Sequence, residues 1–218
     1  MKTRFEFLCP GGRPSHEDHA LFSKQWRSPF FAFLGFRPIA AQHTREEDDA
    51  IRQAARMRKS IVEIGVAEGA SAAAIRQEMA PDGTLYLIDP FHLGRWKYLN
   101  GMKRAARSAV GTSRRGRVVW IEKFSQDAVS AWRTPIDFLF IDGDHREAAV
   151  HRDWDDWHSF VVPSGLVAFH DARVFAGGWL SSDAGPVKLV NHLFRHGGAT
   201  DWRIIQEVHS LVIAQRKH

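Results

Sequence analysis

The chain has 218 residues, 44% of them hydrophobic, which indicates a globular domain with its own core and excludes a disordered chain. No apolar run approaches the roughly 18 residues of a membrane span, and we expect neither a membrane protein nor a secretory signal. The formal net charge of +5 leaves an acidic partner open, and the single cysteine, Cys9, excludes an intrachain disulfide and favours a cytoplasmic protein.

The first 43 residues do not share the pattern of the rest, and we expect residues 1–43 to form an N-terminal extension or cap. Its Phe-rich run, residues 28–36, is typical of core, of a subunit contact or of a lid over a substrate, and a homodimer would fit it. Residues 44–218 then form the main domain. They begin with a helix over 44–58, where Thr44 is the expected N-cap and Glu47 completes a capping box.

From residue 60 onward, short apolar segments alternate with helical ones. Strands are predicted at 60–65, 84–89, 117–122, 136–142 and 166–171, and a closing hairpin within 201–215. Helices are predicted at 70–80, 95–110, 125–132, 146–161 and 184–196, with a turn at 163–165. Strands that are apolar throughout and separated by helices predict an α/β fold, a doubly wound, mostly parallel sheet with helices on both faces.

Positive charge is concentrated between residues 95 and 117, where eight basic residues occur without an acid. One interpretation is the solvated face of a helix and its following loop. The other is a rim that attracts an anionic substrate or RNA, although the stretch contains no recognisable nucleic-acid module. The eight residues are Arg95, Lys97, Lys103, Arg104, Arg107, Arg114, Arg115 and Arg117.

Acidic residues follow every strand predicted between residues 60 and 171. Ligands of doubly wound sheets bind at the carboxyl ends of the strands, so an acid-lined site there suits a ligand with amine and hydroxyl groups and a positive centre. The polar residues at these ends are Glu63, Asp89, Ser125, Asp127, Asp142, Asp144, His145, His170 and Asp171.

A glycine-containing turn follows the first of these strands in "EIGVAEGAS". It lacks the third glycine of a dinucleotide-binding turn and the lysine of a phosphate loop. Gly65 and Gly69 let the backbone approach a ligand closely, and Asp89 could accept hydrogen bonds from two ribose hydroxyls. Taken singly, Glu63 and Asp89 are equally well interpreted as turn or helix-capping acids.

Five segments together resemble the class I S-adenosylmethionine (SAM) methyltransferases: "VEIGVAEGASAAAI", "GTLYLIDPF", "FSQDAV", "IDFLFIDGDHREAAVHRDWDDW" and "PSGLVAFHDA". Within that class they are similar to small-molecule O-methyltransferases of the catechol, macrocin and cephalosporin-pathway types. The resemblance covers about residues 58–215. It implies a Rossmann-like seven-stranded sheet with an antiparallel last strand, and a hydroxylated acceptor such as a sugar or another secondary metabolite. "PSG" departs from the family's Pro-Gly-Gly turn.

The resemblance also implies roles for individual residues. Glu63 and Gly65 would open the SAM loop and face the methionine part, and Glu68, Gly69 and Ser71 would continue it. Asp89 would hold the ribose, Ser125 and Asp127 would border the adenine, and Asp142 would lie near the methionine moiety and the reacting methyl group.

Metal-dependent relatives bind Mg²⁺ or a similar ion at the positions of Asp142, His170 and Asp171. Histidine is a poor ligand for Mg²⁺, so a softer ion, binding through the two aspartates alone, and no metal at all remain open. Asp144 and His145 are the candidate general bases. Asp144 is also a candidate N-cap of the following helix.

Other functions are compatible with parts of the pattern. An RNA methyltransferase would use the basic stretch of residues 95–117, although we do not expect nucleic acid as the partner. A nicotinamide-dependent oxidoreductase would need a tighter glycine turn and a second domain. A non-haem iron oxygenase and a protein that keeps the fold only for binding are further alternatives. Trp179 lies in a glycine-rich segment, residues 175–188, which is expected either to shape the acceptor pocket or to be a plain connector.

Overall fold

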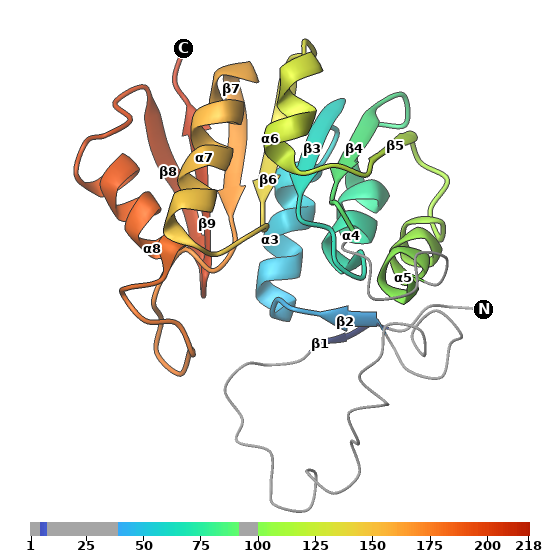
Figure 1. Ribbon diagram of the computed structural model, residues 1–218, viewed down its shortest axis with the longest axis horizontal. Helices are drawn as coiled ribbons and strands as arrows, with labels where there is room; N and C mark the ends of the chain where they lie inside the picture. The colour runs from blue at the N-terminus through green and yellow to red at the C-terminus, as the bar shows by residue number, and fades with distance from the viewer. Residues whose placement is uncertain (1–4, 8–38, 92–99) are drawn as a thin grey trace, which may run out of the picture.

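The computed structural model describes residues 5–7, 39–91 and 100–218 (Figure 1). Seven strands form the main sheet in the order β5-β4-β3-β6-β7-β9-β8. Only β9 runs antiparallel to its neighbours, β7 and β8. The doubly wound, mostly parallel sheet is therefore confirmed, with the antiparallel strand last in the chain. The strands are β3 Ser60–Ile64, β4 Thr84–Ile88, β5 Arg117–Ile121, β6 Ile136–Ile141, β7 Val161–Phe169, β8 Trp202–Val208 and β9 Leu211–Arg216.

Helices cover both faces of the sheet (Figure 1). One face carries α3 Arg45–Ala55, α4 Ala70–Glu78 and α5 Gly101–Val110, and the other carries α6 Ser125–Ala128, α7 Glu147–Trp157 and α8 Gly185–Val190. Because both faces are covered, a strand must be apolar on both sides. In β6, Phe138 and Phe140 pack toward the α3–α4 face, whereas Leu139 and Ile141 pack toward the α7–α8 face. All four side chains are at most 2% exposed.

The N-terminus of α3 has the predicted capping box. The Thr44 hydroxyl accepts a hydrogen bond from the backbone N–H of Glu47, and the Glu47 carboxylate accepts one from the N–H of Thr44. This reciprocal pair satisfies two N–H groups that lack a partner within the helix. The helix therefore starts at Arg45, as the sequence indicates.

The predicted turn at residues 163–165 is wrong, because these residues lie inside β7. The ladder between β6 and β7 is irregular there: Ile136 pairs with Val161, but Phe138 pairs with Leu166. The extra residues form a bulge in which Ser164 has a φ of +62°, and Pro163 has no N–H to give to a ladder. Tertiary pairing with β6 thus keeps as strand a segment whose local sequence favours a turn.

Several predicted helices are shorter than expected. The segment 125–132 continues beyond α6 only as a 3₁₀ turn, Val129–Ala131, and the segment 146–161 ends at Trp157, followed by a 3₁₀ turn, His158–Phe160. After α8 the chain forms a π-helical turn, Asn191–Arg195. Helix ends fray, and their last turn is often 3₁₀, which explains the two 3₁₀ turns.

The N-terminal segment contributes two short strands, β1 Phe5–Phe7 and β2 Ile39–Ala41, which pair in parallel outside the main sheet. Three predicted features lie outside the described residues: Cys9, the Phe-rich run at 28–36, and residues 95–99 of the helix predicted at 95–110. Within the described part of the chain, no helix combines the length and the apolar character that a bilayer crossing requires.

Candidate active site

The register of the sheet brings the predicted acids to one place. Ile64 of β3 lies opposite Ile88 of β4 and opposite Ile141 of β6, and Ile141 lies opposite Phe169 of β7. The next residues along the four parallel strands, Gly65, Asp89, Asp142 and His170, therefore emerge side by side at one edge. The central β3 is also the strand from which the order reverses, which is where such sheets bind ligands.

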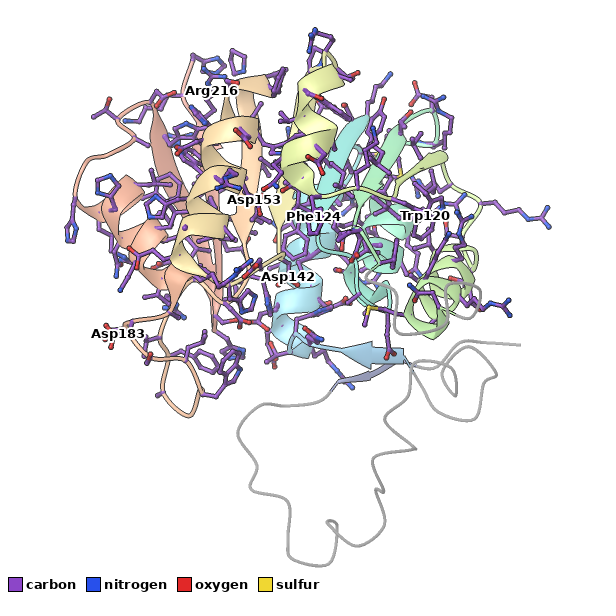
Figure 2. The ribbon with its side chains drawn as sticks, in the orientation of Figure 1. Trp120, Phe124, Asp142, Asp153, Asp183 and Arg216 are labelled. Carbon is purple, nitrogen blue, oxygen red and sulfur yellow. The ribbon has the colours of Figure 1, made fainter. Side chains whose placement is uncertain are left out.

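A cavity of about 710 Å³ opens at this edge. That volume suits a small-molecule ligand. Figure 2 shows Asp142, Phe124 and Asp153, three of its lining residues, close together near the middle of the sheet. Seven of the proposed cofactor-binding residues line it: Gly65, Glu68, Gly69, Ser71, Asp89, Ser125 and Asp142.

The glycine turn forms one wall of the cavity and touches the neighbouring strand end. Gly65 has a φ of +86°, and a Cβ built on it would lie 2.1 Å from the carbonyl oxygen of Asp142. Asp89 holds the same turn, because its Oδ2 accepts hydrogen bonds from the backbone N–H groups of Val66 and Ala67, at 2.9 and 3.1 Å. Its Oδ1 accepts a further bond from the N–H of Phe91 at 2.6 Å, so the turn-capping interpretation of Asp89 is correct, and the residue also lines the cavity.

Glu63 lies beneath the cavity and does not line it. Its side chain is fully buried, and Oε1 accepts a 2.5 Å hydrogen bond from the Ser71 hydroxyl, while Oε2 has no hydrogen-bond partner. Burial raises the pKa of Glu63 well above its usual value; the Ser71 bond opposes this, and the charges of Asp142 and Asp89 add to it. Burial thus favours the protonated form of Glu63, which contacts Ser71 at the wall of the cavity.

Asp142, His170 and Asp171 form a compact cluster beside the cavity. Each offers one ligand atom, and these atoms lie within 4.8 Å of one another. The His170 Nδ1 lies 3.3 Å from Asp142 Oδ1 and 3.6 Å from Asp171 Oδ2. The ring is buried, and neither nitrogen makes a hydrogen bond. Such orphaned buried nitrogens are uncommon, and they are expected of a side chain whose partner is an ion.

The charges in this cluster depend on each other. Burial alone would raise the pKa of Asp142, but the charges of His170 and His145 hold it well below its usual range. Burial alone would lower the pKa of His170, but the neighbouring carboxylates, Asp142 first, raise it well above its usual value. Contact with Asp142 likewise raises the pKa of His145, against the effect of burial. The sequence interpretation assumed an unperturbed His145.

The two candidate bases lie in different surroundings. His145 faces the cluster, with Nε2 3.6 Å from Asp142 Oδ1 and Nδ1 3.6 Å from Asp171 Oδ2. Asp144 turns toward Arg146, accepting a hydrogen bond from its backbone N–H at 2.9 Å and pairing with its guanidinium. It does not occupy the N-cap position, which belongs to Arg146, and α7 begins at Glu147.

The cavity wall also contains a residue that the sequence interpretation missed, Asp153 of α7, whose Oδ2 would lie 3.4 Å from a Cβ built on Gly143. It is 5% exposed, it lines the cavity, and its carboxylate accepts a hydrogen bond from the Ser125 hydroxyl. Burial raises its pKa to about 6; the Ser125 bond opposes this, and the charges of Asp156 and Asp144 add to it. The sequence feature that could have revealed Asp153 is its position as an acid within the apolar stripe of Val150, Trp154 and Trp157. Asp127 is exposed and is not among the lining residues.

Some basic residues of the stretch 95–117 make contacts within the protein. In the basic stretch, Lys103 and Arg107 pair with Glu122, and the Arg107 guanidinium lies 4.9 Å from the ring centre of Trp120. Structural contacts therefore account for part of this charge.

Trp179 is 59% exposed in the loop after β7, and this loop lies at the same edge of the sheet as the cavity (Figure 1).

A family model described as a methyltransferase domain matches residues 62–172, slightly more than half of the chain. The chain belongs to this methyltransferase family. Its fold is shared with solved structures of low sequence identity. The O-methyltransferase TomG from Streptomyces achromogenes, involved in tomaymycin synthesis and solved with SAM, has a TM-score of 0.61 at 16% identity, covering 93% of this chain and 95% of that one.

Two more structures share the methyltransferase fold. An O-methyltransferase from Bacillus cereus, in complex with S-adenosylhomocysteine (SAH), has a TM-score of 0.57 at 15% identity, covering 92% of this chain and 94% of that one. An rRNA methylase from Streptococcus thermophilus has a TM-score of 0.55 at 10% identity, covering 82% and 100%. Proteins with this fold therefore include O-methyltransferases and an rRNA methylase.

Proposed function

We propose that this methyltransferase transfers a methyl group from SAM to a hydroxyl group of a small molecule, such as a sugar or another secondary metabolite, with a divalent metal ion assisting. One observation carries the proposal. The glycine turn, Asp89 and Asp142 line a single cavity, and the Asp142–His170–Asp171 cluster lies directly beside it. A donor site and a site for activating an oxygen nucleophile thus share Asp142.

The residues that line the cavity suit the chemical groups of SAM. Gly65 and Gly69 provide a backbone wall without side chains, and Asp89 and Asp142 offer carboxylates to hydroxyl groups and to a cationic ligand. In SAM the ribose supplies the hydroxyls, and the amino group and sulfonium supply the positive charge. Ser125, joined to Asp153 by a hydrogen bond, is the lining residue proposed to border the adenine.

The three residues of the cluster also fit a metal ion. Ligand atoms 3.3 and 3.6 Å apart are spaced like neighbouring ligands around one ion with bonds of about 2.1 Å. Asp142, His170 and Asp171 would hold the ion. When bound, it would lower the pKa of the acceptor hydroxyl and orient that group.

The chain's own residues do the remaining work. In the transfer, a carbon–oxygen bond forms to the acceptor as the carbon–sulfur bond of the sulfonium breaks, which leaves SAH, and the hydroxyl proton must go to a base. His145 is placed for that role beside Asp142 and Asp171, whereas both oxygens of Asp144 are engaged by Arg146. Alignment of donor and acceptor by the cavity supplies further acceleration.

Calorimetric titration of the protein with SAM, SAH and NAD tests the donor. We expect saturable binding of SAM and SAH and none of NAD, and binding of NAD alone would overturn the proposal. Methyl transfer is then assayed on a panel of hydroxylated small molecules and on RNA, each with and without a chelator. Transfer to RNA alone, with binding that weakens steeply as salt rises, would assign the acceptor to nucleic acid instead.

A further inference from the structure

Glu47 reaches the cluster from a different part of the fold, the first turn of α3. Its Oε2 lies 3.6 Å from Nε2 of His170, on the side of the ring away from Asp142 and Asp171. Both side chains are 2% exposed. His170 therefore lies between a carboxylate on one side and two carboxylates on the other, out of contact with water.

The Glu47 carboxylate is held in place from three directions. Oε1 accepts hydrogen bonds from the backbone N–H and the hydroxyl of Ser210, at 2.8 and 2.7 Å, and Oε2 accepts one from the N–H of Thr44 at 2.7 Å. Ser210 lies in the turn between β8 and β9, so the helix N-terminus and that turn fix the same side chain. The capping oxygen Oε2 is the same atom that faces His170, so the cap and the Ser210 turn together hold it toward the ring.

An ionised carboxylate can only accept hydrogen bonds, and a neutral imidazole has one donor nitrogen and one acceptor nitrogen. With a metal ion bound at Nδ1 the ring would be neutral, and its hydrogen would lie on Nε2, the nitrogen that faces the Glu47 carboxylate. Nδ1 then faces Asp142 Oδ1 and Asp171 Oδ2. A carboxylate behind a metal-binding histidine fixes the tautomer and orientation of the ring in this way and increases its basicity.

We propose that Glu47 is a positioning residue that orients the His170 ring as a metal ligand and thereby gives the site a preference for Mn²⁺ over Mg²⁺. The inference rests on the proposed metal site. Mg²⁺ binds oxygen ligands almost exclusively, whereas an imidazole nitrogen favours first-row transition metals. Glu47 contributes without touching the ion.

The test is a calorimetric titration of the SAM-free protein with MnCl₂ and, in a separate experiment, with MgCl₂. Glu47→Gln removes the charge and keeps the shape, and we expect it to weaken Mn²⁺ binding roughly 10–100-fold. The matched control is Glu46→Gln, the exposed neighbour in the same helix turn, which should leave the affinity unchanged. Equal Mn²⁺ affinity in wild type and Glu47→Gln would overturn the inference.

A double-mutant cycle shows whether Glu47 acts through His170. His170→Asn removes the imidazole and offers an oxygen ligand, so it should weaken Mn²⁺ binding and shift the preference toward Mg²⁺. In that background Glu47→Gln should have no further effect on Mn²⁺ affinity. An equal loss in both backgrounds would mean that Glu47 acts only as a nearby charge, which overturns the positioning role.

A measurement on the wild type covers the case in which Glu47→Gln does not fold. The ¹⁵N chemical shifts of His170 in the Zn²⁺-loaded protein should report a hydrogen on Nε2 and metal at Nδ1, and the reverse assignment overturns the inference. These readouts need neither SAM nor an acceptor, so a failure of the methyl-transfer proposal leaves them interpretable. Absence of saturable binding of either ion would overturn both this inference and the metal part of the proposed function, whereas SAM titration tests the remainder.

Discussion

Gly65→Ala tests the close approach of the glycine turn to the β6 strand end. Alanine at a φ of +86° adopts the left-handed region, which costs about 1–2 kcal/mol. The new Cβ would also lie 2.1 Å from the Asp142 carbonyl oxygen, an overlap with backbone that no side-chain rotation relieves. Overpacking of this kind costs about 1–3 kcal/mol. We therefore expect a loss of roughly 2–5 kcal/mol in the free energy of unfolding.

Thermal unfolding followed by circular dichroism measures this loss, at about 2–4 °C of Tm for each kcal/mol in a chain of this size. Gly177→Ala is the matched control, because Gly177 has a φ of +81° and a Cβ there would meet nothing within 4 Å. It should show the conformational part alone. If the two substitutions lower Tm equally, the turn and the strand end are not in close contact, and the shared cavity wall is refuted.

Three further predictions concern the buried acids and the metal. Burial raises the pKa of Asp153 from its ordinary value of 3.8 to about 6, so the native state binds more protons between pH 4 and 6 and stability falls as pH rises through that window. Asp153→Asn should remove that dependence, which is worth roughly 3 kcal/mol between pH 4 and 7 and is measured by urea unfolding at each pH. The control Asp155→Asn, at an exposed position on the same helix, should keep it. An unchanged pH dependence of stability in Asp153→Asn would contradict the raised pKa. Burial raises the pKa of Glu63 and favours its uncharged form, so Glu63→Gln should change the unfolding free energy by less than about 1 kcal/mol, whereas Glu63→Ala should cost about 2 kcal/mol or more; equal losses would contradict the raised pKa. Asp142→Asn or a chelator should lower kcat/KM by about 100-fold or more, while Asp144→Asn should lower it by less than about tenfold, and a full rate in the presence of chelator would exclude the metal.

Much of the fold follows from patterns that are local in sequence. The capping box at Thr44 and Glu47 sets the start of α3, and the apolar strands separated by helices indicate a sheet covered on both faces. The bulge at Pro163–Gly165 was not predictable in the same way, because it depends on pairing with β6. Strand pairing is a long-range property, and it overrides a local preference for a turn.

The sequence by itself determined which residue types stand at the strand ends, and because parallel strands present those ends at one edge, it also determined that Asp89 and Asp142 would meet. Only the tertiary structure decided that Glu63 lies beneath the cavity and that Asp153 of α7 lines the pocket. It alone brought Glu47 against His170, a contact between residues 123 positions apart in sequence. Side-chain direction and burial depend on packing between elements distant along the chain, and no local pattern carries that information.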